Sequence, residues 1–140
     1  MIATPMTMEA MQAIMDASPF IRFHGMRVEG CDPTAQSVTV AMPFRAELER
    51  AEGTGQFHGG AIASLIDTAG DFALVMSLGG AVPTINFRVD YLRPSKGQRL
   101  VAEARVRRAG RTVGVVDVDV LDADGRLVAV GRGCYGTFLG

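Results

Sequence analysis

The sequence is poor in the residues that build metal sites and disulfide frameworks. It contains 2 cysteines and no tryptophan among 140 residues. The cysteines, Cys31 and Cys134, are too few for a disulfide framework and too far apart in sequence for a metal-ligand pair, so we interpret both as structural thiols. We therefore expect no metal and no redox cofactor.

Neither basic nor acidic residues are in clear excess. The 14 basic and 15 acidic residues give a net charge of -1, so the molecule as a whole has no electrostatic attraction for nucleic acid or for an anionic membrane. The N-terminal residues lack the basic region and apolar core of a secretory signal, which makes the cytoplasm the expected compartment. The one long apolar stretch, residues 61–78, contains Asp67 and Asp71, which favours a buried core helix over a membrane span.

The composition is sufficient for one folded domain, which we expect to span residues 1–140. Hydrophobic residues make up 48% of the chain and charged residues 21%, as in an ordinary globular domain of this length. In the first half of the chain, apolar spacing and turn residues predict a short amphipathic helix over 6–17, strands over 26–29 and 37–42, a loop over 43–57, and an almost wholly apolar helix from His58 to Gly79.

Beyond Pro83 the apolar period changes from that of a helix to that of a strand. Apolar and polar residues alternate through four segments, 85–91, 100–106, 113–120 and 127–137, which short turn-rich segments connect. Such short connections predict an antiparallel meander. We therefore expect an α+β fold in which an antiparallel sheet curls round one long central helix, with a short helix at the N-terminus.

Two carboxylates in the apolar helix are the first candidates for chemistry. A carboxylate among apolar neighbours must be paired, protonated or placed at a functional site, and Asp67 has Leu65, Ile66 and Ala69 beside it. Asp71 lies one turn later near the same face, where each acid raises the proton affinity of the other. The alternatives are that Asp67 bonds to a neighbouring strand and that Asp71 lies in solvent or at a subunit contact.

The start of the same helix is the second candidate. A helix N-terminus presents unpaired N–H groups, and the pair Gly59-Gly60 would let a ligand atom approach them closely, so a developing oxyanion would be stabilised there. His58 could be an acid or base, or it could cap the helix. A dinucleotide site is rejected because the glycines of residues 53–59 miss the required spacing, and the sequence has no G-x-S-x-G, P-loop or zinc motif.

Basic residues are concentrated in one segment. Residues 88–111 hold eight of the 14 basic residues and only two acids. One interpretation is a charged strand edge that prevents aggregation. The other is a binding surface for a phosphate-bearing ligand, for which arginine is well suited.

These residues resemble the hotdog-fold acyl-CoA thioesterases, in particular the PaaI-like group that includes the 4-hydroxybenzoyl-CoA and phenylacetate-pathway enzymes. The main match is residues 55–67, GQFHGGAIASLID, in which an H-G-G turn precedes a helical carboxylate by eight residues. Residues 83–94, PTINFRVDYLRP, the turn at Gly110-Arg111 and the hairpin at 124–129 also match. The likeness covers about residues 19–138.

The resemblance assigns roles to residues by position. It implies that the Gly59 N–H polarises the thioester carbonyl, that Asp67 is the nucleophile or the general base for water, and that the Thr84 hydroxyl helps to hold that water. Glu52 stands where the family usually has Asn or Gln, and an ionised carboxylate cannot donate a hydrogen bond as an amide does. Glu52 is therefore either a second acid or a surface residue.

Helix geometry implies a shared site. Gly59 and Asp67 are eight residues apart on one helix, or ~12 Å along its axis, so they cannot both reach one carbonyl carbon. If both act, Gly59 of one subunit must meet Asp67 of another, and the protein is at least a homodimer with two equivalent sites. The resemblance implies the same arrangement, often doubled to a homotetramer.

The sequence thus predicts an acyl-CoA thioesterase that needs no cofactor, since coenzyme A is part of its substrate. The residues expected to bind that substrate are Gly60, Asp71, Arg93, Arg108 and Arg111, with the arginines meeting the nucleotide phosphates. Two alternatives stay open. One is a hotdog dehydratase or hydratase, which needs a histidine base, and the other is a non-catalytic acyl-CoA binding module.

Overall fold

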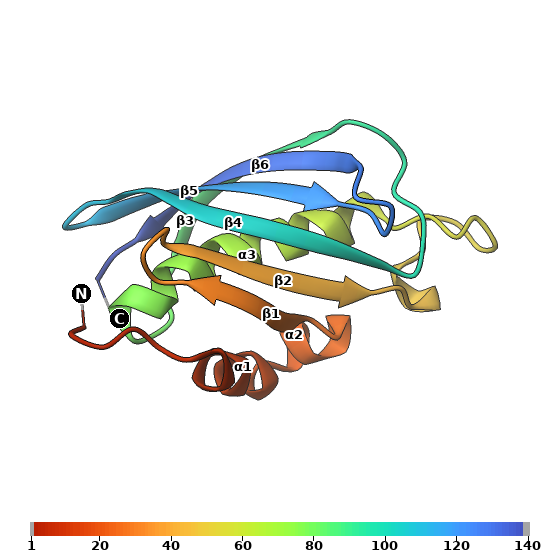
Figure 1. Ribbon diagram of the computed structural model, residues 1–140. Coiled ribbons are helices and arrows are strands. Elements are labelled where there is room, and N and C mark those ends of the chain that lie inside the picture. Colours follow the sequence, from red (N-terminus) through yellow and green to blue (C-terminus); the bar gives the residue numbers. More distant parts are fainter. Residues whose placement is uncertain (1, 139–140) are drawn as a thin grey trace.

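A single antiparallel sheet curls over one long helix. The computed structural model describes residues 2–138 (Figure 1), and its elements are α1 (Met8–Ala17), α2 (Pro19–His24), β1 (Arg27–Asp32), β2 (Ser37–Pro43), the 3-10 turn η1 (Ala46–Leu48), α3 (Gly59–Leu78), β3 (Thr84–Tyr91), β4 (Arg99–Ala109), β5 (Val113–Leu121) and β6 (Leu127–Gly136). The six strands lie in the order β1-β2-β4-β5-β6-β3. This confirms the predicted α+β hotdog architecture.

The central helix α3 begins and ends where the sequence predicts. His58 is its N-cap, and Gly79 ends it in the left-handed conformation at φ 85°, a backbone geometry that glycine adopts without strain. Although α3 is long and apolar enough to cross a membrane, 67% of its most apolar stretch is buried inside the protein, as in a core helix. The sheet leaves one stripe of α3 only partly covered, at positions spaced three and four apart: Gly60, Ala63, Ser64, Asp67 and Asp71.

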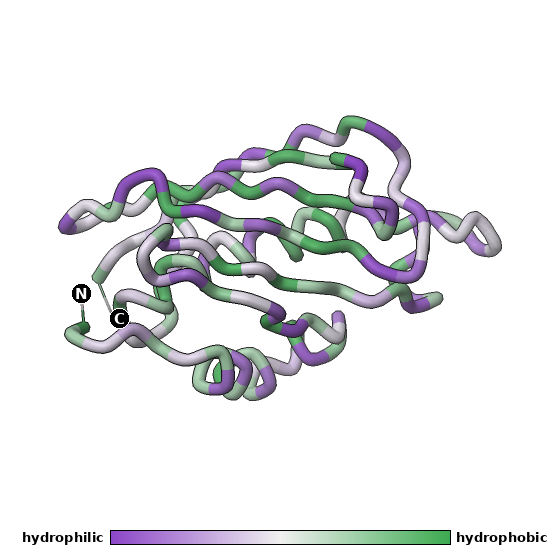
Figure 2. Tube along the Cα trace, viewed as in Figure 1, coloured by the Kyte–Doolittle hydropathy of each residue, from purple (hydrophilic) through white to green (hydrophobic). Residues whose placement is uncertain are grey.

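The sheet packs one face on α3 and turns the other to solvent. Apolar and polar residues alternate along β4 and β5, as the coloured trace in Figure 2 shows. On the inner face, small and branched side chains such as Ala102, Ala104, Val116, Val118 and Val120 are almost completely buried against α3. Alternation of this kind buries the apolar set on one face only and so fixes the strand register.

The predicted meander is wrong for β3. Instead of pairing with β4, β3 pairs with β6 and forms an edge of the sheet. The connection over residues 92–98 therefore passes the ends of β6 and β5, a span of three strand spacings of ~4.8 Å that seven residues cover easily. Main-chain bonds fasten it on the way: Leu92 N–H donates to Val128, Phe57 N–H donates to Ser95, and Phe44 N–H donates to Gln98.

The N-terminal helices cover the opposite edge of the sheet. The Gln12 side chain on α1 accepts from the Val28 N–H at 2.7 Å and donates to the Met26 carbonyl at 3.2 Å, so it occupies the free edge of β1 as a further strand would. The six-residue helix α2 is absent from the sequence prediction, although Ser18 as N-cap and Pro19 at the first turn are start signals for a helix. The two edges thus differ, because β1 is covered and β3 is open.

A close contact between β6 and α3 gives a test of this packing. A Cβ at Gly131 would lie 2.6 Å from Ile66 Cγ2 and 2.9 Å from the Arg88 carbonyl oxygen, whereas a Cβ at Gly30 would lie 3.7 Å from its nearest neighbour. We expect Gly131→Ala to lower the free energy of unfolding by ~1–3 kcal/mol through overpacking. Gly30→Ala, the matched control, should change it by less than ~0.5 kcal/mol. Urea denaturation measures both, and equal effects would contradict the packing described.

Candidate active site

The first turn of α3 leaves one amide without a partner. The His58 ring accepts from the Gly60 N–H at 2.8 Å through Nδ1, and the His58 carbonyl accepts from the Ala61 and Ile62 N–H groups. Within residues 2–138, the Gly59 N–H donates to no protein acceptor, so it is the donor available at this helix end. His58 is therefore a helix cap with its Nδ1 occupied, and of the two glycines only Gly59 has a free N–H.

Two neighbouring segments hold this helix start in place. The His58 N–H donates to the Leu48 carbonyl at 2.7 Å, and the Phe57 N–H donates to the Ser95 carbonyl at 2.9 Å. The preceding loop is braced by Glu49, whose carboxylate accepts from the N–H groups of Gly53 at 2.9 Å and Gly55 at 2.6 Å. The sequence alone did not single out this carboxylate.

Glu52, which the resemblance places near the reaction, lies on the surface of this loop. Its side chain is exposed and lines a shallow depression together with Glu49, Glu47 and Ala46. Among the described residues it makes no hydrogen bond or ion pair with the groups at the start of α3 or with Asp67. A single chain therefore does not bring Glu52 together with the other candidate residues.

Asp67 is half-buried and has one strong partner. The Thr84 hydroxyl donates to its Oδ1 at 2.8 Å. Burial raises the pKa of Asp67 above its ordinary value, and the bond from Thr84 opposes that rise because it stabilises the ionised form. The resemblance implies that the Thr84 hydroxyl helps to hold the water, which stays a prediction. In this chain the hydroxyl donates to Asp67 itself and so orients the carboxylate.

A β-bulge brings Thr84 to this position. Strict alternation along β3 would place Thr84 on the face opposite to Phe87, Val89 and Tyr91. The pairing with β6 shifts by one residue at Ile85, because Thr84 is opposite Tyr135 while Asn86 is opposite Cys134. The extra residue returns Thr84 to the α3 side, so that both ends of β3 present a side chain to the helix.

Asp71 lies one turn beyond Asp67 on the same stripe of α3. Its Oδ1 is buried and has no hydrogen-bond partner among the described residues. Burial raises the pKa of Asp71 to about 7, the Val82 N–H opposes the rise, and the Asp67 charge adds to it. The two carboxyl groups therefore differ in proton affinity, as expected for acids on one helix face in unequal environments.

A pocket of about 390 Å³ opens beside Gly59. It lies between the start of α3, the end of β3 and the crossing connection, and its lining includes Gly59, Tyr91, Arg93 and Arg50. The sequence did not point to Arg50 or Tyr91, because the pocket forms only when the 92–98 connection crosses the sheet end. The Tyr91 hydroxyl donates to the Gly59 carbonyl at 2.7 Å, which ties β3 to the helix start.

The predicted phosphate-binding arginines fall into two places. Arg93 lines the pocket beside Gly59. Arg108 and Arg111 lie at the β4–β5 turn, at the other end of the sheet and next to the end of α3 (Figure 1). Other basic residues of the segment are in ion pairs, for example Arg99 with Glu29 at 2.6 Å. One chain therefore does not form a single basic surface from the whole segment.

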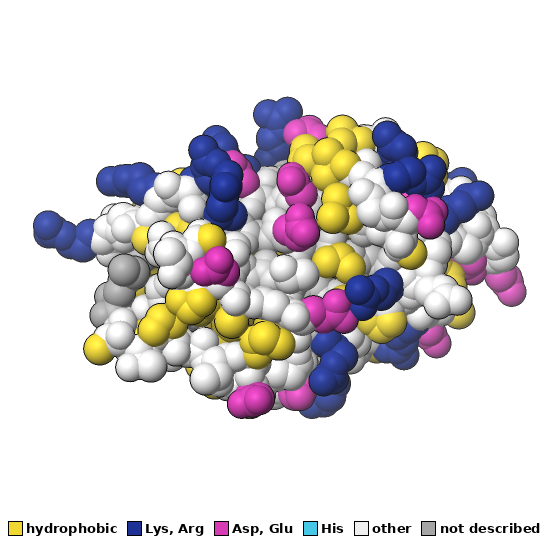
Figure 3. Space-filling view, in the orientation of Figure 1, with side chains coloured by type: hydrophobic (Ala, Val, Ile, Leu, Met, Phe, Trp, Pro, Cys, Tyr) yellow, Lys and Arg dark blue, Asp and Glu magenta, His cyan; other side chains and the backbone are white. Residues whose placement is uncertain are grey.

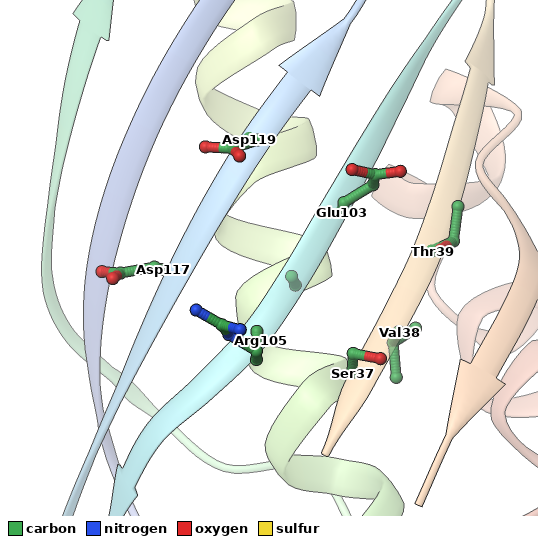
Figure 4. A pocket seen from close by; sticks show the side chains of 8 residues that line it. Ser37, Val38, Thr39, Glu103, Arg105, Asp117 and Asp119 are labelled. Carbon is green, nitrogen blue, oxygen red and sulfur yellow. The ribbon is translucent and has the colours of Figure 1, made fainter. Parts of the chain in front are cut away.

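The outer face of the sheet is a mixed charged surface, as Figure 3 shows. A second hollow of about 390 Å³ lies here, on the face away from α3, and Figure 4 shows its lining: Ser37, Val38, Thr39, Glu103, Ala104, Arg105, Asp117 and Asp119. Asp117 is paired with Arg132 at 2.6 Å, and that bond holds the pKa of Asp117 below its ordinary value. None of the predicted site residues lies in this hollow.

No group of three or more His, Cys, Asp or Glu side chains within residues 2–138 is arranged to hold a metal ion. The available groups are a backbone amide, carboxyl groups and a hydroxyl. Such groups suit acyl transfer, in which an amide stabilises an oxyanion and a carboxylate takes a proton or attacks carbon.

A hotdog fold with an amide and carboxyl groups on its central helix and a hydroxyl on the neighbouring edge strand defines a class, the hotdog enzymes that act on thioesters. The comparison with known proteins agrees, since the sequence pattern of the Thioesterase superfamily matches residues 54–129. The chain belongs to the Thioesterase superfamily, which confirms the predicted family and the assignment to thioester hydrolases.

Named relatives support the same assignment. A Halobacterium salinarum protein named as an esterase is 38% identical over 91% of this chain and 89% of its own length. Human acyl-coenzyme A thioesterase 13 is 32% identical over 66% of this chain and 69% of its own. The solved structure of the Escherichia coli PaaI protein from the phenylacetic acid degradation operon has a TM-score of 0.81 and 27% identity, and it covers 94% of this chain and 93% of that one.

The raised pKa of Asp71 gives a test of its burial. A raised carboxyl pKa means that the folded state binds more protons than the unfolded state between pH ~4 and about 7, so stability falls as pH rises through this range. Asp71→Asn removes this penalty. We expect the variant to gain ~2 kcal/mol or more in free energy of unfolding at pH 8 and little at pH 4. Urea denaturation at both pH values measures the gain, and an equal gain at both would contradict the burial.

Proposed function

We propose that the protein hydrolyses acyl-CoA thioesters to a free acid and coenzyme A. The observation that carries the proposal is the unpartnered Gly59 N–H in the wall of a pocket, on the same helix as a carboxylate that Thr84 orients. An amide donor and an oriented carboxylate are the two groups that thioester hydrolysis needs.

The two groups must come from different subunits. They are eight residues apart on α3, ~12 Å along its axis, and a rigid helix cannot bring them to one carbon atom. The open edge of the sheet offers a way to join subunits. Along β3, Ile85, Phe87 and Tyr91 are 54%, 38% and 53% exposed, and an uncovered edge with apolar side chains favours pairing with another strand. By contrast, Gln12 occupies the β1 edge.

Pairing two β3 strands about a twofold axis would assemble the site. The Tyr91 end of β3 is bonded to Gly59, and the Thr84 end is bonded to Asp67. In an antiparallel pair of identical strands, the Tyr91 end of one lies beside the Thr84 end of the other. Gly59 of one subunit would then face Asp67 of the second, and two equivalent sites would form. A tetramer made from two such dimers stays a prediction from the resemblance.

The reaction then follows from the groups present. The Gly59 N–H binds the thioester oxygen, and Asp67 of the other subunit takes a proton from water as the water oxygen attacks the carbonyl carbon. The C–S bond of the tetrahedral intermediate breaks, and the thiolate leaves with the proton from Asp67. Water and acyl-CoA thus give the acid and the free thiol. In the alternative route, Asp67 attacks the carbonyl carbon and the C–S bond breaks, so that an anhydride forms and the thiolate leaves. Water then hydrolyses the anhydride, which releases the acid and the Asp67 carboxylate, and the remaining proton goes to the thiolate.

The names of the relatives and the charges around the pocket support coenzyme A as the thiol. The E. coli and human relatives are named acyl-coenzyme A thioesterases, and Arg93 and Arg50 line the pocket beside Gly59. The twofold axis would also bring Arg108 and Arg111 of the second subunit to the same end of the assembly. Phosphates of the nucleotide are suitable partners for such arginines.

The capping role of His58 favours hydrolysis over dehydration. A hotdog dehydratase needs a histidine base, and here the His58 Nδ1 is occupied by the Gly60 N–H. His24, the other histidine, bonds the Phe20 carbonyl through Nδ1 at 2.8 Å and is buried. Neither histidine therefore has the environment of a free catalytic base.

Thiol release from a series of acyl-CoAs, from acetyl to palmitoyl and with phenylacetyl-CoA, tests the proposal. We expect turnover of at least one ester by the unaltered protein and a loss of ~100-fold or more in kcat for Asp67→Asn, because an amide cannot accept the proton from water. Asp119→Asn, on the outer face of the sheet, is the matched control and should retain full activity. Coenzyme A binding without turnover by the unaltered protein would support the binding-module alternative instead.

A further inference from the structure

Both tyrosines of the chain donate to main-chain carbonyls of α3, and they do so at the two residues with roles in the proposed reaction. The Tyr91 hydroxyl donates to the Gly59 carbonyl at 2.7 Å, and the Tyr135 hydroxyl donates to the Asp67 carbonyl at 3.0 Å. Burial explains the second bond, since Tyr135 is fully enclosed and a buried hydroxyl needs a partner. Burial does not explain the first, because Tyr91 is half-exposed and water could satisfy its hydroxyl.

The start of α3 needs such a support. Two successive glycines, Gly59 and Gly60, have the greatest backbone freedom of any pair, and the amides of a first turn lack helical partners. The Tyr91 bond fixes the carbonyl of Gly59 from outside the helix. The ring also packs on the glycine, because a Cβ at position 59 would lie 3.2 Å from both Cζ and the hydroxyl oxygen of Tyr91.

We propose that Tyr91 is a positioning residue for the hydrolysis: its hydroxyl and ring hold Gly59 so that the Gly59 N–H stays directed at the thioester oxygen. This inference rests on the proposed function above. Tyr91 makes and breaks no bond itself and acts through Gly59. The same contact favours glycine at position 59, since a Cβ there would lie closer to the Tyr91 ring than side chains normally pack, and the ring would have to shift by a few tenths of an ångström.

The position of Tyr91 also links the donor to the subunit contact. Tyr91 is the last residue of β3, the edge strand through which we propose that the subunits pair. A strand that is fixed by a partner holds its end residue more firmly than a free edge does. Through the hydrogen bond from Tyr91, pairing of two β3 edges would therefore also restrict the motion of Gly59, whose N–H is the oxyanion donor.

The test is a kinetic cycle on the full-length protein with the best acyl-CoA of the series as probe. It compares the unaltered protein, Tyr91→Phe, Gly59→Ala and the double variant. Phenylalanine keeps the ring in the pocket wall and removes only the hydroxyl. We expect kcat of Tyr91→Phe to fall ~10-fold, the effect of one lost hydrogen bond on an aligned donor, while KM stays within ~2-fold. Exchange of the hydrogen-bonded amides of residues 60–62 should become faster in the same variant.

The double variant separates positioning from other roles. In Gly59→Ala the ring would have to shift and its bond to the carbonyl of residue 59 would be weakened, so the further change of Tyr91 to Phe should lower kcat by clearly less than the ~10-fold expected in the glycine background. A rise in KM alone would make Tyr91 a binding residue and would overturn the inference. An unchanged kcat in Tyr91→Phe would also overturn it, as would the same loss of kcat with glycine and with alanine at position 59. Absence of turnover in the unaltered protein would instead overturn the proposed function, and amide exchange would still report on the Tyr91 bond.

Discussion

The rigidity of α3 is the constraint on which the rest of the structure depends. The helix carries both groups of the proposed chemistry, and it holds them eight residues apart within a closely packed core. A helix surrounded by a curled sheet cannot bend to bring its first turn and its middle to one substrate atom. In the proposed reaction each chain would therefore supply half of each site, and a second subunit would complete it.

Strand β3 contacts both halves of the proposed site, the start of α3 and the Asp67 carboxylate. One end bonds the helix start through Tyr91, and the other bonds the carboxylate through Thr84, with the bulge at Ile85 turning Thr84 to the helix side. This strand is also the open edge of the sheet, whereas α1 covers the β1 edge. Thr84 and Tyr91 are seven residues apart on β3. In a pair of β3 strands related by a twofold axis, this separation would determine how far the Gly59 amide of one subunit lies from the Asp67 carboxylate of the other.

Local sequence features were enough to predict the central helix, α1 and the six strands, though not α2, but they did not show which strands pair. The cap at His58, the left-handed Gly79 and the change of apolar period gave the helix and strands, and an acid among apolar neighbours pointed to Asp67. Alternation in β3 cannot show which strand it pairs with, so its place beside β6, the bulge at Ile85 and the pocket formed by the crossing connection were missed. The roles of Arg50 and Tyr91 depend on that pairing.

Activity of mixed subunits tests the shared site most directly. Gly59→Pro removes the proposed donor and also crowds the Tyr91 ring, but proline is well tolerated at the first position of a helix. Asp67→Asn removes the carboxylate. Neither variant alone should be active. When the two variants are refolded together in equal amounts, half of the dimers should be mixed, each with one intact site. We therefore expect about a quarter of the unaltered activity. No recovery in dimers shown to be mixed would contradict a site built from two subunits.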